Sequence, residues 1–222
     1  MNVFSCGTRI IMTLFNSSAL FFSVKLASCQ EIQNYLGFSQ PDGVYKLEHS
    51  DGGSTLVYCD MHTAGGGWSL VYRYSFTDYA NFKQGTNAVS LAPDWSYSCD
   101  VPKSSTPPLS ETEYGAVAYN RWQHLSVTNE FMFKSNIMHW VNCTPTTSGA
   151  SIATLTDGTF SCDKIKLIGT VCESTSYANV IFKVGSEPQP ILFLNTMSVG
   201  YEFIYWDCLT TTGNWPSHDR CG

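Results

Sequence analysis

Residues 55–72, TLVYCDMHTAGGGWSLVY, decide the fold that this sequence predicts. Two short apolar runs, at 56–58 and 68–72, are rich in the β-branched and aromatic residues that favour strands. Gly65, Gly66 and Gly67 lie between the runs, and glycine allows backbone angles and close approaches that a Cβ would forbid. We therefore expect two strands joined by a glycine-rich turn, with Cys59 placed to anchor the end of the first strand.

Short elements are expected on both sides of this hairpin. A helical segment at 29–35, a Gln-Pro-Asp-Gly turn at 40–43 and a strand at 44–47 would complete a small meander over residues 29–72. Residues 114–122 indicate a short helix or strand. Polar loops are expected at 101–110 and 144–158, and further strands at the apolar runs 131–134, 164–168, 180–184, 191–194 and 202–206.

The composition favours a β-rich extracellular protein. The 222 residues are 43% hydrophobic and 14% aromatic, which is enough to bury a core, and only 14% are charged, against about a quarter in an average protein. The formal net charge is -6 and no basic block is present. The chain therefore lacks the electrostatic pattern of a nucleic-acid-binding protein.

Residues 1–28 are typical of a secretory signal peptide. Arg9 supplies a positive charge, apolar runs follow at 10–15 and 19–22, and Ala27 and Ser28 offer small residues for cleavage. Polar residues interrupt the apolar segment, whereas a membrane-spanning helix needs about 20 apolar residues. We expect a secreted, extracellular protein with no membrane span.

The cysteine count agrees with secretion. Removing residues 1–28 takes away Cys6 and leaves an even number, which indicates a framework of four disulfides formed in an oxidising compartment. The count alone does not assign their pairing. The remaining cysteines are Cys29, Cys59, Cys99, Cys143, Cys162, Cys172, Cys208 and Cys221.

Three segments carry a more specific pattern: C-x-E-I at 29–32, G-V-Y-K-L at 43–47, and V-Y-C-D-M-x-T-x-G-G-G-W-S-L-V at 57–71. Together they resemble the start of a fibrinogen-like domain, and collagen C-propeptides and neurexin-like proteins share a similar opening. The resemblance implies a disulfide between Cys29 and Cys59. The matching residues are Cys29, Gly43, Val44, Tyr45, Val57, Tyr58, Cys59, Asp60, Met61, Thr63, Gly65, Gly66, Gly67 and Trp68.

The resemblance also sets the expected architecture. After the signal peptide at 1–28, one fibrinogen-like domain would span 29–222, with an N-terminal subdomain at about 29–75 and a divergent remainder at 76–222. The fold class is α+β and β-rich: a small disulfide-linked meander followed by a larger twisted, mainly antiparallel sheet with long loops.

The C-terminal part departs from the family pattern. Cys208 and Cys221 are similar to the family's closing disulfide loop, which implies that they pair, while Cys99, Cys143, Cys162 and Cys172 have no assigned partner. Fibrinogen-like domains usually carry a calcium loop with paired Asp residues before this loop, but residues 198–202 read Ser-Val-Gly-Tyr-Glu. Calcium needs six to eight oxygen ligands, so we expect neither a family-type metal site nor a cofactor.

No catalytic motif is recognisable. The chain has no H-E-x-x-H, no G-x-S-x-G and no phosphate-binding loop, and paired cysteines cannot act as nucleophiles. Asp60 is a candidate acid, but we expect it to order the turn by accepting hydrogen bonds from backbone amides. No histidine lies at ligand spacing from another, so each is expected to be a surface or half-buried residue rather than a zinc ligand: His49, His62, His124, His139 and His218.

The sequence therefore predicts a non-enzymatic binding protein. Its partner would be a glycan, an extracellular protein or a matrix surface. The alternative is a structural component of the extracellular matrix that associates with other matrix chains or with mineral. Asn214 and Trp215 are the candidate ligand contacts. Asn142, in Asn-Cys-Thr, is the candidate glycosylation site.

Overall fold

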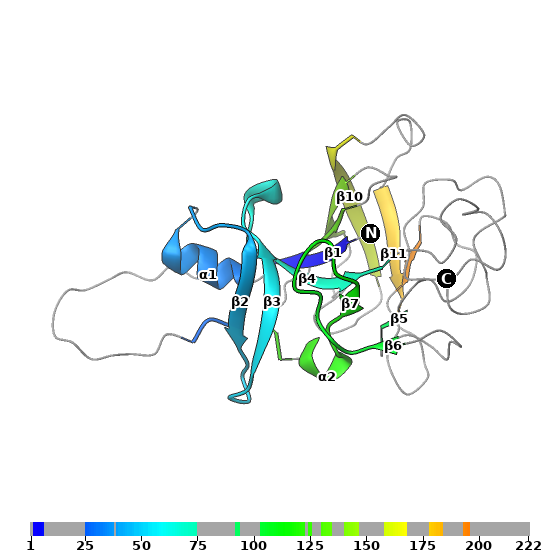
Figure 1. The fold of residues 1–222 in the computed structure, drawn as a ribbon. Coiled ribbons are helices and arrows are strands. Elements are labelled where there is room, and N and C mark those ends of the chain that lie inside the picture. Colours follow the sequence, from blue (N-terminus) through cyan, green and yellow to red (C-terminus); the bar gives the residue numbers. More distant parts are fainter. Residues whose placement is uncertain are drawn as a thin grey trace.

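The computed structural model describes residues 2–6, 25–37, 39–74, 92–93, 103–122, 124–125, 130–134, 140–146, 158–167, 178–183 and 193–195. Most of these residues belong to one sheet in which every strand pair is antiparallel (Figure 1). Its order is β12-β11-β10-β9-β8-β1-β4-β3-β2, and β7 also pairs with β4. Its strands are β1 (Asn2–Cys6), β2 (Gly43–Glu48), β3 (Ser54–Asp60), β4 (Trp68–Arg73), β7 (Gly115–Ala116), β8 (Phe131–Lys134), β9 (Trp140–Pro145), β10 (Gly158–Lys166), β11 (Ala178–Lys183) and β12 (Phe193–Asn195).

The remaining elements are short. Strands β5 (Ala92–Pro93) and β6 (Lys103–Ser104) form a separate parallel pair. The helices are α1 (Cys29–Leu36), the 3-10 turn η1 (Thr63–Gly65) and α2 (Tyr119–Trp122). Among the described residues, none of these helices has the length and hydrophobicity needed to cross a membrane.

The predicted fold class is confirmed. The meander β2-β3-β4 is present, with α1 beside it, and a mainly antiparallel sheet follows (Figure 1). The two parts form one continuous sheet, because β1 pairs with β4 on one side and with β8 on the other.

The N-terminal residues occupy a position in the sheet that the sequence did not predict. Asn2–Cys6 lies inside the predicted signal peptide, yet here it forms a strand at the centre of the sheet. A cleaved signal peptide would not remain in the mature sheet, so the two assignments describe different forms of the chain. Cleavage at 1–28 remains a prediction.

Local signals explain the boundaries of α1. Ser28 has an extended backbone, and its side chain accepts a hydrogen bond from the Glu31 amide at 3.1 Å, as a helix N-cap does. Gly37 ends the helix at φ 94°, in a region that favours glycine, and its amide donates to the Gln33 carbonyl at 2.8 Å. The disulfide between Cys29 and Cys59, which the resemblance implied, fastens this helix to β3.

The core lies between strands that are distant in sequence. Trp68, Leu70 and Met132 form a buried cluster against which Tyr58 packs. Nearby, the ring of Phe131 contacts that of Phe160 edge-on, with 5.0 Å between ring centroids. Phe131 and Met132 are consecutive in β8, so the two groups of buried side chains lie on opposite faces of the sheet.

Two strands differ from the sequence-based expectation. The loop expected at 144–158 begins too early, because β9 extends to Pro145. Strand β10 begins at Gly158, earlier than the expected 164, and the disulfide Cys143–Cys162 joins β9 to β10 where these residues face each other. Polar and small residues interrupt these strands, so a prediction based on apolar runs does not detect them. The strand expected at 202–206 lies outside the described residues.

Candidate functional site

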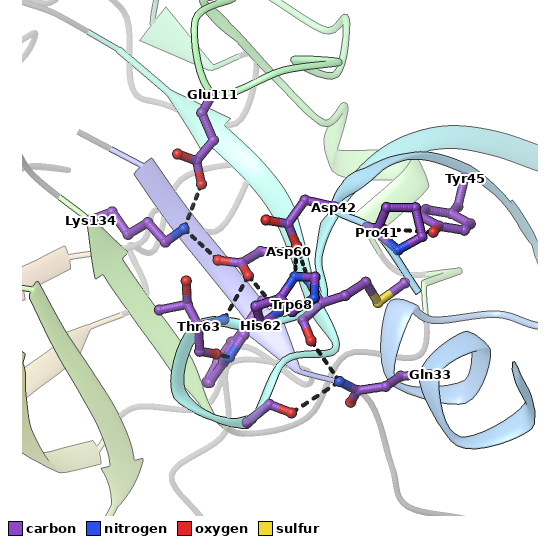
Figure 2. Close-up of polar contacts among 12 residues, drawn as sticks. Gln33, Pro41, Asp42, Tyr45, Asp60, His62, Thr63, Trp68, Glu111 and Lys134 are labelled. Carbon is purple, nitrogen blue, oxygen red and sulfur yellow. Dashed lines mark hydrogen bonds and ion pairs between the residues drawn. The ribbon is translucent and has the colours of Figure 1, made fainter. Parts of the chain in front are cut away.

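A buried ion-pair network surrounds the glycine turn (Figure 2). Asp60, at the end of β3, is fully buried, and its Oδ1 accepts hydrogen bonds from the amides of His62 at 3.0 Å and Thr63 at 2.8 Å. Its Oδ2 pairs with the Nζ of Lys134 on β8. The same Nζ reaches the Oε1 of Glu111 at 2.5 Å. One ammonium group therefore joins three segments that are far apart in the sequence.

The network keeps Asp60 ionised. Burial alone would raise the pKa of this carboxyl group, but hydrogen bonds from Lys134, Thr63 and His62 outweigh burial and lower the pKa. A buried carboxylate with these partners is poorly suited to exchange protons with a bound substrate. The prediction that Asp60 orders the turn through backbone amides is confirmed.

The glycines let α1 approach the turn closely. Gly66 has φ +73°, and a Cβ built on it would lie 2.0 Å from the Met61 carbonyl oxygen and 2.2 Å from the Gln33 Nε2. Gln33 Nε2 donates to the carbonyls of Met61 at 2.8 Å and Gly65 at 3.1 Å. Any side chain at Gly66 would displace this amide, so the turn and the helix depend on each other.

An exposed histidine–carboxylate pair flanks the turn. His62 Nδ1 lies 2.8 Å from Asp42 Oδ1, which also accepts the Met61 amide at 2.6 Å (Figure 2). Such a pair can orient an imidazole for catalysis, but nucleophilic catalysis also needs a hydroxyl or thiol bonded to the other ring nitrogen. Within the described parts of the chain, no such group contacts His62. We interpret the pair as a support for the turn.

A second polar cluster lies at the tip of the β2–β3 hairpin. We name it the histidine cluster and define it as His49, Asp51 and His124. The two imidazole rings stack with 6.0 Å between centroids, and Asp51 lies between them, with Oδ1 3.7 Å from His49 Nδ1 and Oδ2 3.6 Å from His124 Nε2. The expected surface or half-buried position is confirmed for His124 but is wrong for His49, which is buried. The residues are 75 positions apart in sequence, so no spacing rule could find them.

The histidine cluster is not arranged as a metal centre. Throughout the described ranges, no group of three or more His, Cys, Asp or Glu side chains has an arrangement that could hold a metal ion. The segment at 198–202, where fibrinogen-like domains usually carry calcium ligands, lies outside those ranges.

The predicted site residues are only partly described. Asn142 lies on β9, opposite Met132 of β8 and Asp163 of β10, and its Oδ1 is buried with no hydrogen-bond partner in the described structure. Cys143 and Cys162, whose pairing the sequence left open, are bonded to each other. The remaining predicted residues lie outside the described ranges: Asn214, Trp215, Cys99, Cys172, Cys208 and Cys221.

One face of the β2–β3 hairpin is open to solvent. Val44 is 45% exposed and Leu56 is 50% exposed. The register pairs Val44 with Tyr58 and Lys46 with Leu56, so these four side chains lie on the same side of the sheet. We name this set the outer hairpin face. It combines exposed aliphatic groups with a half-buried phenol and a cation, a composition suited to contact with another molecule.

A comparison with models of known protein families finds none that matches this chain.

Proposed function

We propose that this chain is a secreted, non-enzymatic binding protein, related to fibrinogen-like domains, that recognises a glycan or another extracellular partner. The outer hairpin face carries this proposal, because it holds exposed Val44 and Leu56 side by side on a rigid pair of strands. Exposed apolar groups that adjoin one another mark contact surfaces more often than isolated ones do.

The disulfides support an extracellular location. Cys29–Cys59 and Cys143–Cys162 are both formed, and such bonds persist chiefly in oxidising compartments. The fibrinogen-like assignment rests on the motifs at 29–71. The Cys29–Cys59 bond agrees with it, since this pairing is the one that the motifs imply.

The experiment is retention of the purified protein on immobilised sugars and on extracellular-matrix proteins, with calcium and with chelator. Retention on at least one surface is expected, and Leu56→Ser should reduce it about tenfold or more. Leu167→Ser is the matched control, since Leu167 is also exposed, at 62%, but lies just after β10. Retention on no surface would contradict a binding function, and equal loss in both variants would contradict the role of the outer hairpin face.

A structural role in the matrix is the second candidate. Strand β2 is the last strand in the described sheet order, and an edge strand can pair with another chain. Concentration-dependent assembly in sedimentation, together with no retention on any sugar, would favour this role. A protein that stays monomeric at high concentration would count against it.

A further inference from the structure

The tip of the β2–β3 hairpin is held against the segment that follows α2 mainly through the histidine cluster. His49 is buried and stacks on His124, and Ser50 Oγ lies 3.4 Å from His124 Nδ1. The hairpin turn itself is closed by two backbone hydrogen bonds, from the His49 amide to the Gly53 carbonyl at 2.8 Å and from the Gly52 amide to the His49 carbonyl at 3.1 Å. Separation of the two rings would remove contacts that hold this turn against the segment after α2, and its two backbone bonds would report the change.

The ring nitrogens of His49 have unequal partners. Nε2 lies 2.7 Å from Thr55 Oγ1, within hydrogen-bond distance. Nδ1 is buried and has no hydrogen-bond partner, and Asp51 Oδ1, at 3.7 Å, is too far away to supply one. A neutral ring with an unprotonated Nδ1 fits this position, because a proton there would place a charge in a buried site without a direct acceptor.

Groups of both signs lie around His49. The hairpin contributes Glu48 and Asp51, and the segment of α2 contributes Arg121 and His124. Arg121 approaches the turn from the side, with its Nη1 3.5 Å from the position that a Cβ on Gly53 would occupy. A protonated His49 would therefore face the Arg121 guanidinium, while Asp51 Oδ1, 3.7 Å from Nδ1, is too far away to accept a hydrogen bond from it.

We propose that this contact is an acid-sensitive clasp, closed while the buried His49 ring is neutral and opened when that ring takes up a proton. The opened state frees the turn at 49–53 from the segment after α2, and leaves the rest of the sheet in place. The outer hairpin face lies on the same two strands but outside this turn. The clasp does not depend on what that face binds.

The direction of the pH effect follows from His49. Burial lowers its pKa, and Arg121 and His124 lower it further, whereas Asp51 and Glu48 act in the opposite direction. A pKa that is lower in the folded protein than the unfolded value of 6.5 means that the closed clasp is most stable above pH 6.5 and loses stability as the pH falls below it. The Gly53 amide lowers the pKa of Asp51, which keeps this carboxylate ionised throughout that range.

Amide hydrogen exchange measured by NMR tests the clasp. Protection factors, corrected for the intrinsic effect of pH, are compared at pH 7.5 and 5.0 for the amides of His49 and Gly52. We expect a fall of about tenfold or more relative to the amides of His62 and Thr63, which bond to Asp60. The ring signals of His49 should titrate below 6.5. Equal protection at both pH values, or titration of His49 above 6.5, would overturn the proposal.

Variants separate the clasp from general acid unfolding. His124→Gln removes the ring that stacks on His49 and lowers the pKa of His49, and should reduce the pH-dependent loss of protection at His49 and Gly52 several-fold. Arg121→Gln should move the opening to lower pH. His62→Gln is the control, because His62 has its own carboxylate partner away from the cluster. An unchanged pH profile in His124→Gln, or the same reduction in His62→Gln, would contradict the clasp.

Discussion

Two lysines show how burial changes the contribution of an ion pair to the stability of the fold. The side chain of Lys134 is 7% exposed and pairs with Asp60 and Glu111, whereas that of Lys46 is 61% exposed and pairs with Glu48 at 2.9 Å. Removing one partner of a buried pair leaves an uncompensated charge, but an exposed pair is screened by solvent.

Lys134→Met should therefore lower the free energy of unfolding by about 3–5 kcal/mol, because the Asp60 carboxylate would stay buried without its cation. Lys46→Met is the matched control and should change it by about 0–1 kcal/mol. Urea unfolding followed by tryptophan fluorescence measures both. Similar losses in the two variants would show that the Asp60–Lys134 pair does not support the fold.

Asp60 also predicts an effect of acid. Its pKa is lower in the folded protein than the ordinary 3.8, so its contribution to stability is present above that value and is lost as the pH falls through the folded pKa. Asp60→Asn should be less stable than the parent at pH 6, and the difference should shrink towards pH 2. Unfolding free energies measured across this range provide the check. A difference that stays constant with pH would contradict an ionised Asp60.

At this scale the sequence predicted the role of Asp60 but not its partner. The motif around the glycines indicates that a carboxylate there accepts backbone amides. Lys134, by contrast, ends the run Phe131–Lys134, and nothing in that run shows that its ammonium group turns toward a carboxylate 74 residues away. His49 and His124 escaped notice for the same reason, since side-chain contacts across a sheet depend on strand order.

Two neighbouring glycines of the turn differ sharply in the space available for a side chain. Gly65 and Gly66 both have positive φ, at +92° and +73°. A Cβ on Gly65 would meet nothing within 4 Å, whereas one on Gly66 would clash with the backbone of Met61. The two positions therefore separate backbone strain from the loss of space beside α1.

Gly65→Ala should cost about 1–2 kcal/mol, the price of a left-handed backbone with a Cβ. Gly66→Ala should cost more than about 4 kcal/mol or prevent folding, because the Gln33 side chain and the Met61 carbonyl would both have to move. Thermal unfolding and the yield of folded protein measure the effects. Equal stability of the two variants would show that α1 does not need its close approach to the turn.

The elements near the N-terminal motif were the most predictable from sequence. Helix α1 and strands β2, β3 and β4 lie where the helical segment, the apolar runs and the turn residues indicate. Strand β9 was missed because Asn142 and Thr144 interrupt the apolar pattern, while pairing with β8 and β10 on either side provides the stabilisation. Local sequence records propensity, but a central strand gains most of its stability from its neighbours.

At the scale of the whole molecule, the position of β1 decides how the sheet is completed. Residues 2–6 pair with β4 and β8, and the same residues belong to the segment predicted to be cleaved. Sequence could not foresee this strand, because residues 2–6 lie within the segment whose positive charge and apolar runs indicate a secretory signal.

We expect the protein secreted from eukaryotic cells to begin near residue 29 and to lack residues 2–6. Intact mass and N-terminal sequencing measure this directly. In that form, the amides of Phe131–Lys134 that face β1 should exchange faster than in a chain that retains residues 1–28. A secreted chain that keeps residues 2–6 would contradict the signal peptide and make β1 part of the mature fold.

The two described disulfides have a mechanical consequence. One fastens α1 to β3 and the other fastens β9 to β10, on opposite sides of β1 in the strand order. Each half of the sheet thus contains one of these disulfides, whereas backbone hydrogen bonds between strands hold the junction β4-β1-β8. In a chain that retains residues 2–6, tension applied across the sheet should separate the two disulfide-linked halves at this junction before either half unfolds.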